Sequence, residues 1–222
     1  MWNIWGLRYL ARRPERGGSD PQKSIRKKPL FKLSTKVLEG SLLCAKALKP
    51  DLEKKFGKHS EEFESKYFLV LFEFMYFFLH LTDRYAFAQL GHEKRNKLID
   101  ELVPPTIDAT IETYFDHWPK KVKDGIRTDF YNNLNNAQME YGSCKEVLLD
   151  PNDDTRIFEK LKSGAKSKSV VGQLTDNLSE IIEGEINMNA LFTTRIWGLV
   201  IESSETGKEI QDLVSEVSKE IG

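Results

Sequence analysis

The sequence predicts an all-α protein: an irregular bundle of about seven or eight helices around one long, central apolar helix. Three observations support this fold class. Apolar residues recur at helical spacing from residue 30 onward, no segment alternates with the period of two that a strand requires, and Tyr67–Leu81 contains only two strongly polar residues. The 222 residues are 40% hydrophobic and 30% charged, which is an ordinary globular composition.

The first 36 residues differ from the rest in charge. They carry ten Lys and Arg side chains against Glu15 and Asp20, so their net charge is +8, and the rest of the chain carries −9 because the total is −1. Residues 14–29 contain three prolines and two glycines. We therefore expect a basic, flexible arm over 1–29 and a single helical domain over 30–222. Residues 1–36 suit either an anionic membrane surface or nucleic acid, or they form a solvated tail.

The first two helices are predicted from apolar spacing and end signals. The first ends at Pro50 and is marked by Leu38, Leu42, Leu43, Ala45 and Leu48. Ser60 is followed by three glutamates within four residues, a pattern that predicts a capped helix start. This second helix contains the apolar stretch and is expected to run to about Leu90, with Gly91 ending it.

The remaining helices follow in order. A short helix over His92–Val103 is expected to end at Pro104-Pro105. Two amphipathic helices lie on either side of Pro119, and the second reaches about Gly142. An acidic turn at Asp150–Thr155 precedes a short helix to Leu161. Three further helices are predicted over 170–182, 191–201 and 210–221.

The apolar helix carries one narrow polar stripe. Lys66, Glu73 and His80 are each seven residues apart, and Arg84 follows four later, so all four fall within about 40° around the helix. We expect this stripe to be the solvent edge of a helix that protein otherwise surrounds. The alternative is that the stripe faces inward, where Glu73 and His80 meet polar residues of other helices.

An inward-facing stripe makes a candidate site. Buried carboxylates and imidazoles change their pKa or bind metal, so Glu73, His80, Asp83 and Arg84 are the candidate catalytic residues, and the first three are the candidate metal ligands. No motif for binding an organic cofactor is found, and the identity of any cofactor is left open. A second acidic row, Asp108, Glu112 and Asp116, lies opposite an apolar face and is expected to be solvated surface.

Several classes of protein are disfavoured. The chain has no Walker motif, no GxGxxG after a strand and no G-x-S-x-G. Cys44 and Cys144 are its only cysteines, which indicates reduced thiols and a cytoplasmic location. The apolar stretch has fifteen residues, and a membrane span needs about 20, so no transmembrane span is expected.

The function predicted from these features is a non-enzymatic helical interaction or scaffold protein that binds a protein partner or a second copy of itself. The basis is the amount of apolar surface on one helix, together with the absence of a catalytic motif. One alternative is a helical-bundle enzyme or metal-binding protein with its site near Glu73 and His80. Another is a peripheral membrane or nucleic-acid-associated protein that acts through the basic arm.

Overall fold

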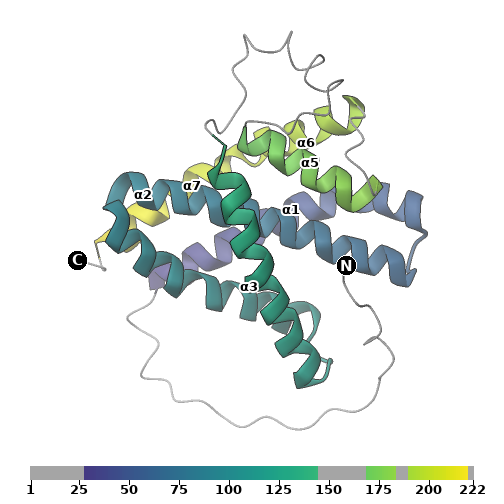
Figure 1. Cartoon of the computed structure of the whole chain (residues 1–222), viewed down its shortest axis with the longest axis horizontal. Coiled ribbons are helices and arrows are strands. Elements are labelled where there is room, and N and C mark those ends of the chain that lie inside the picture. Colours follow the sequence, from purple (N-terminus) through teal and green to yellow (C-terminus); the bar gives the residue numbers. More distant parts are fainter. Residues whose placement is uncertain (1–27, 145–168, 184–189, 220–222) are drawn as a thin grey trace.

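The computed structural model describes residues 28–144, 169–183 and 190–219, and within these ranges the chain forms six helices (Figure 1). Their bounds are α1 Lys28–Phe56, α2 Glu61–Tyr114, α3 Lys120–Gly142, α5 Val170–Glu183, α6 Ala190–Glu202 and α7 Ser204–Ser218. The predicted all-α class is therefore confirmed for the described residues. Of the basic arm predicted over 1–29, residues 1–27 lie outside these ranges, and residues 28 and 29 begin α1. The acidic turn at 150–155 and the short helix predicted after it also lie outside the described residues.

Helix α2 begins where the sequence predicts. The Ser60 hydroxyl accepts a hydrogen bond from the backbone N–H of Phe63 at 3.0 Å, and glutamates occupy the first turn. The predicted stop at Gly91 is also present as a break, because Gly91 has φ +72° and ψ −179° inside α2. Only glycine adopts this conformation without strain. Gly91 therefore divides α2 into a first arm, residues 61–90, and a second arm, residues 92–114.

The two arms of α2 run antiparallel and form a helical hairpin. The Phe68 ring lies 4.5 Å from the Phe115 ring just after the second arm, and the Thr110 hydroxyl donates to the Met75 sulfur at 3.6 Å. Near the tip, Asp83 and Arg95 form an ion pair across Gly91. These contacts place the end of the second arm beside the start of the first.

The described residues form six helices rather than the predicted seven or eight. Two expected helix ends are wrong, and the one at Pro104-Pro105 divides into two what the structure shows as one helix. Pro50 lies inside α1, and Pro104-Pro105 lies inside α2. A proline in a helix deprives the carbonyl four residues earlier of its partner. Lys46 and Asp100, two of the residues that lose a partner, are exposed, so water can replace the missing hydrogen bonds.

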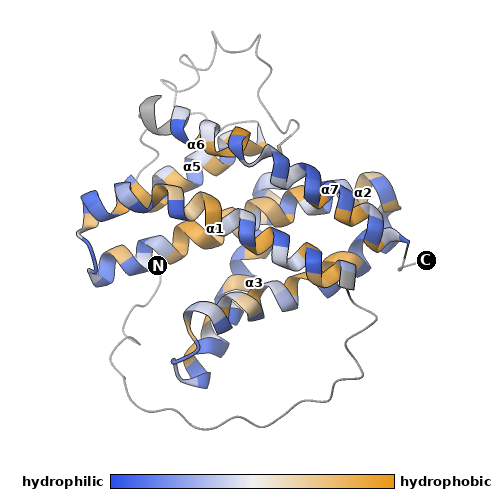
Figure 2. Cartoon of the chain, turned by 180° about the vertical axis from the view of Figure 1, so that it is seen from behind, coloured by the Kyte–Doolittle hydropathy of each residue, from blue (hydrophilic) through white to orange (hydrophobic). Residues whose placement is uncertain are grey.

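Helix α2 packs against α1, α3, α5 and α7. Helix α7 runs antiparallel to α1, since Lys36 pairs with Glu209 and Gly40 lies against Thr206. Hydrophobic and hydrophilic residues alternate along both helices (Figure 2). Helix α3 crosses the first arm of α2 obliquely in Figure 1, and the Phe130 ring contacts Phe72 at 5.5 Å. No described helix is long and apolar enough to cross a membrane.

Candidate functional site

The polar stripe of α2 is buried, so its expected role as a solvent edge is wrong. Glu73 is 7% exposed, His80 3% and Asp83 7%, while Lys66 and Arg84 are half-buried. Every residue from Val70 to Asp83 is buried, because other helices cover α2 on all sides over this length. The candidate site therefore lies inside the protein, where α3 and α5 meet the first arm of α2.

Glu73 binds residues from two other helices through one oxygen. The Tyr141 hydroxyl of α3 donates to Glu73 Oε1 at 2.5 Å, and the Asn177 side-chain amide of α5 donates to the same oxygen at 2.8 Å. Gln173, one turn earlier on α5, donates to the Asn177 side-chain oxygen at 2.8 Å and fixes the orientation of that amide. Three helices thus meet at a single carboxylate oxygen.

Burial controls the protonation of this carboxyl. It raises the pKa of Glu73 from 4.5 to about 7, because a charged carboxylate is poorly solvated there. The hydrogen bonds from Tyr141 and Asn177 lower this pKa, and the negative charges of Glu140 and Glu180 raise it. Burial also raises the pKa of the Tyr141 phenol well above its usual value, so Tyr141 keeps its proton and acts as a donor to Glu73.

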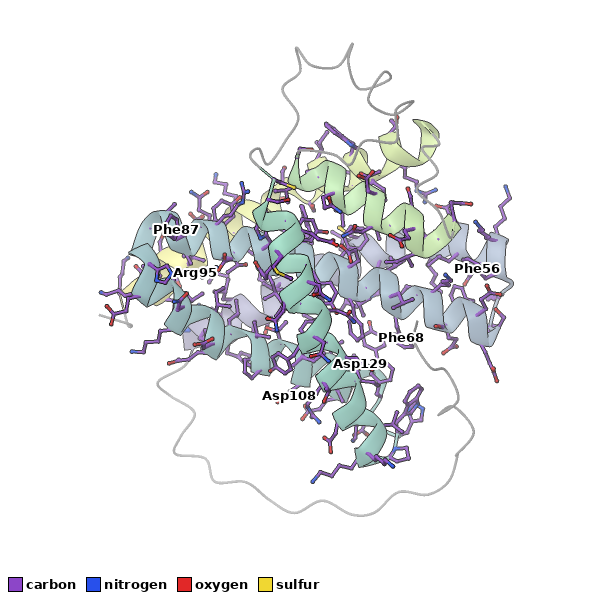
Figure 3. All side chains as sticks on the ribbon, viewed as in Figure 1. Phe56, Phe68, Phe87, Arg95, Asp108 and Asp129 are labelled. Carbon is purple, nitrogen blue, oxygen red and sulfur yellow. The ribbon has the colours of Figure 1, made fainter. Side chains whose placement is uncertain are left out.

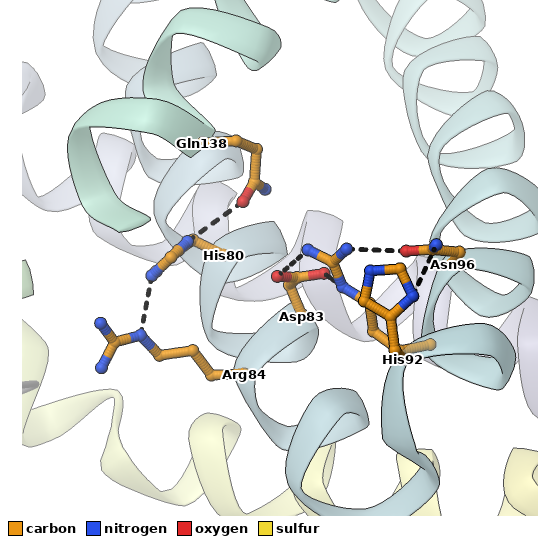
Figure 4. A network of polar contacts seen from close by, with 7 residues as sticks. His80, Asp83, Arg84, His92, Asn96 and Gln138 are labelled. Atoms are coloured by element: carbon orange, nitrogen blue, oxygen red, sulfur yellow. Dashed lines mark hydrogen bonds and ion pairs between the residues drawn. The ribbon is translucent and has the colours of Figure 1, made fainter. Parts of the chain in front are cut away.

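The imidazole of His80 is neutral and lies next to Tyr141, which is the hydrogen-bond partner of Glu73. Its Nδ1–H donates to Gln138 Oε1 at 3.1 Å, and its Nε2 accepts from Arg84 Nε at 2.9 Å (Figure 4). The ring stacks on Tyr141 with centroids 5.4 Å apart. Burial lowers the pKa of His80, and the Arg84 charge lowers it further, both in agreement with a neutral imidazole.

Asp83 has a separate role. It forms a two-point ion pair with Arg95, in which Arg95 Nη2 lies 2.5 Å from Asp83 Oδ2. Arg95 also donates to Asn96 at 2.7 Å, and the Asn96 amide lies 3.5 Å from His92 (Figure 4). Arg95 lies on the second arm (Figure 3), so this ion pair joins the two arms of the hairpin beside Gly91.

The structure brings only some of the predicted site residues together. Glu73 and His80 belong to one cluster because Tyr141 contacts both, and Arg84 joins it through His80. Asp83 pairs with Arg95 instead. Among the residues that the structure describes, no group of three or more His, Cys, Asp or Glu side chains is placed to hold a metal ion. The three proposed metal ligands thus do not converge on a common point.

The second acidic row and the two cysteines do not form part of this site. Glu112 and Asp116 are exposed, as the sequence predicts, and Asp108 pairs with Arg127 at 2.7 Å. The two cysteines are buried free thiols, Cys44 in α1 and Cys144 just after α3, and burial raises the pKa of Cys44 to about 12. A thiol with so high a pKa is a poor nucleophile at neutral pH.

Sequence reasoning missed four partners in this region: Gln138, Tyr141, Asn177 and Arg95. Tyr141 ends a series of apolar residues at helical spacing, and that spacing does not distinguish a phenol that donates a hydrogen bond from one that only packs. Asn177 lies between Asp176 and Leu178, and this mixed pattern does not distinguish a buried amide from an exposed one, so the sequence offers no signal for it. Arg95 lies beyond the break in α2, so its pairing depends on the fold of the hairpin.

The arrangement is suited to holding helices together and to gaining or losing a proton at Glu73. Glu73 Oε1, both ring nitrogens of His80 and both side-chain oxygens of Asp83 are bound by other groups of the same chain. Comparison of the chain with protein-family models, with curated proteins and with solved structures finds no match in any of the three. Functional inference therefore rests on the site and surface geometry.

Proposed function

We propose that this chain is a non-enzymatic helical interaction protein that associates with a second copy of itself through the exposed side of α6. The apolar surface of the first arm of α2, which suggested an interaction protein from sequence, is buried over residues 70–83. In this proposal that arm is the structural centre, and the association surface lies elsewhere.

Helix α6 lies at the edge of the molecule beside α5, and one of its sides is open to solvent (Figure 2). Its inner side is fixed to α1, because Arg195 donates to the Ala47 carbonyl at 2.7 Å and pairs with Asp51. On the outer side Ile201 is 62% exposed, and open space surrounds the position where Gly198 would carry a side chain. A large exposed aliphatic beside a glycine is the observation that carries the proposal.

The outer side of α6 suits a second copy as the partner. Gly198 and Ile201 are three residues apart, so both lie on this side. In an antiparallel pair of α6 helices related by a two-fold axis, Ile201 of each copy would lie beside Gly198 of the other. The missing side chain at Gly198 would let the two helices approach closely at the centre of the contact.

The experiment is sedimentation velocity over a range of protein concentrations. We expect reversible dimers of the natural chain, and loss of dimers in the variants Gly198→Leu and Ile201→Glu. Gly198→Leu also replaces a glycine inside a helix, so the monomer should become more stable by up to about 1 kcal/mol. Loss of association together with a gain in stability would separate an interface effect from misfolding.

Gly125→Leu is the matched control. Gly125 also lies inside a helix, α3, with open space around it, so the same change should leave association intact. A natural chain that stays monomeric at every concentration would refute the proposed self-association. Dimers that survive both α6 variants would refute the assignment to α6.

The two alternatives are less well supported. A catalytic site near Glu73 and His80 would need polar groups free to bind a substrate, and Glu73 Oε1 and both ring nitrogens of His80 are already bound within the chain. Membrane or nucleic-acid binding through the basic arm stays a separate proposal, since residues 1–27 lie outside the described ranges. A cytoplasmic location also stays a proposal, which the two free thiols support.

A further inference from the structure

Glu73 is the one residue of α2 whose side-chain oxygen is bound by both α3 and α5. Tyr141 and Asn177 each donate to it, so both outer helices depend on the same carboxyl group. The other contacts of these helices with α2 include Phe130 against Phe72 and the Lys66 ammonium on the Ile181 carbonyl at 2.6 Å. The first of these contacts is apolar, and the second joins an ammonium to a neutral carbonyl. His80 of α2 also contacts Gln138 and Tyr141 of α3, and burial lowers the pKa of its imidazole, so this ring changes charge at a lower pH than Glu73.

We propose that Glu73, Tyr141 and Asn177 form a protonation-dependent latch that sets how firmly α3 and α5 are held on α2. With a neutral carboxyl, Glu73 Oε1 serves as the acceptor for both donors and the proton resides on the other oxygen. With an ionised carboxyl, a negative charge lies between three helices with two neutral donors as its partners. Burying such a charge is costly, so ionisation favours the opening of this contact to water.

The groups that face Glu73 act in the same direction. Glu140 of α3 and Glu180 of α5 are both acidic and disfavour its charge. Tyr76, on α2 itself, is a buried phenol whose charged form Glu73 likewise disfavours. The nearby cation Lys66 binds a backbone carbonyl, and Arg84 binds His80 and the Cys144 carbonyl. Because the pKa of Glu73 is about 7, the latch should respond close to neutral pH.

Linkage gives the sign and size of the effect. A carboxyl that reaches water on opening returns toward its ordinary pKa of 4.5. The opening equilibrium of α3 and α5 should then rise about tenfold per pH unit between about pH 5 and about pH 7, and level off above that. The helices α1 and α7 do not contact Glu73 through a hydrogen bond and serve as an internal reference.

Hydrogen–deuterium exchange with mass spectrometry measures this opening in the full chain. Exchange rates from about pH 5 to about pH 8 are divided by the intrinsic rate at each pH, and peptides of α3 and α5 are compared with those of α1 and α7. We expect the rise in α3 and α5 alone. Glu73→Gln keeps the size of the side chain without its charge, so the rise should disappear. Glu112→Gln, an exposed carboxyl of α2, should leave the rise unchanged.

A second variant keeps the proposal testable if Glu73→Gln does not fold. Glu180 is exposed, so Glu180→Gln should fold normally, and removing its charge should lower the pKa of Glu73 and move the midpoint of the rise to lower pH. If packing alone held α3 and α5 on α2, the midpoint would not shift in Glu180→Gln. Equal pH dependence in all helices, or an unmoved midpoint in Glu180→Gln, would overturn the proposal.

Discussion

Replacing Gly40 with alanine tests how closely α1, α2 and α7 approach one another. Gly40 lies inside α1, and a Cβ atom added there would lie 2.7 Å from Thr206 Cγ2 of α7 and 3.2 Å from Cζ of Phe78. The first distance is shorter than any ordinary carbon–carbon contact. Thr206 is β-branched and therefore stiff at χ1, and Phe78 is buried, so neither neighbour moves freely.

Two opposing effects decide the outcome. Alanine in place of glycine inside a helix stabilises the protein by about 1 kcal/mol through helix propensity. Overpacking a buried contact costs roughly 1 to 3 kcal/mol. We therefore expect Gly40→Ala to lower the free energy of unfolding by about 1 kcal/mol, although the same change in an open position would raise it.

Urea unfolding followed by circular dichroism measures the difference, with a double-mutant cycle as the decisive control. Thr206→Ser removes the Cγ2 atom, so adding it to Gly40→Ala should restore stability with a coupling of about 1 kcal/mol. Gly125→Ala, where a Cβ meets nothing within 4 Å, should be stabilising. A Gly40→Ala protein as stable as Gly125→Ala, with zero coupling to Thr206→Ser, would refute the close approach of α1 and α7.

Three further predictions concern the site and the hairpin. The pKa of Glu73 is raised to about 7, so the contribution of Glu73 to stability is present below pH 4.5 and is lost as the pH rises through 7. The pKa of His80 is lowered, so the contribution of His80 is present above pH 6.5 and is lost as the pH falls through the lowered pKa. Urea midpoints at a series of pH values should therefore decline between about pH 5 and about pH 7 and level off above that, and Glu73→Gln should abolish that decline. Arg95→Ala leaves the Asp83 carboxylate buried without its partner and should cost about 2 kcal/mol, part of which Asp83→Asn should recover in the double variant. Ser60→Ala removes the cap of α2 and should cost about 1 kcal/mol in thermal unfolding, whereas Ser60→Asp should not.

The sequence predicts correctly those features of the fold whose cause lies within a few residues. The Ser60 cap and the break at Gly91 depend on residues within one helical turn, so a short stretch of sequence contains the whole cause. The start of α3 just after Pro119 is of the same kind. The helix ends that the sequence predicts at the prolines at 50, 104 and 105 are wrong, because the cost of a proline depends on whether water reaches the freed carbonyls, and the packing of the helix decides that.

The polar stripe shows the opposite situation. Its residues were found from their seven-residue spacing, but that spacing is equally compatible with a surface edge and with an interior contact. The stripe is an interior contact because Tyr141 and Asn177 bind Glu73, and these two residues lie 68 and 104 residues away from it in sequence. Hydrogen bonds over such separations depend on how α3 and α5 are placed.

The helical class, the capped start of α2, its break at Gly91 and the set of polar residues along its first arm can all be predicted from the sequence alone. These follow from periodicity and from hydrogen bonds that close within a few residues. Packing between helices, in contrast, establishes that α2 folds back on itself, that Glu73 and His80 are enclosed and that the outer side of α6 stays open. Burial is a property of the residues that cover a position, and here those residues come from other helices far along the chain.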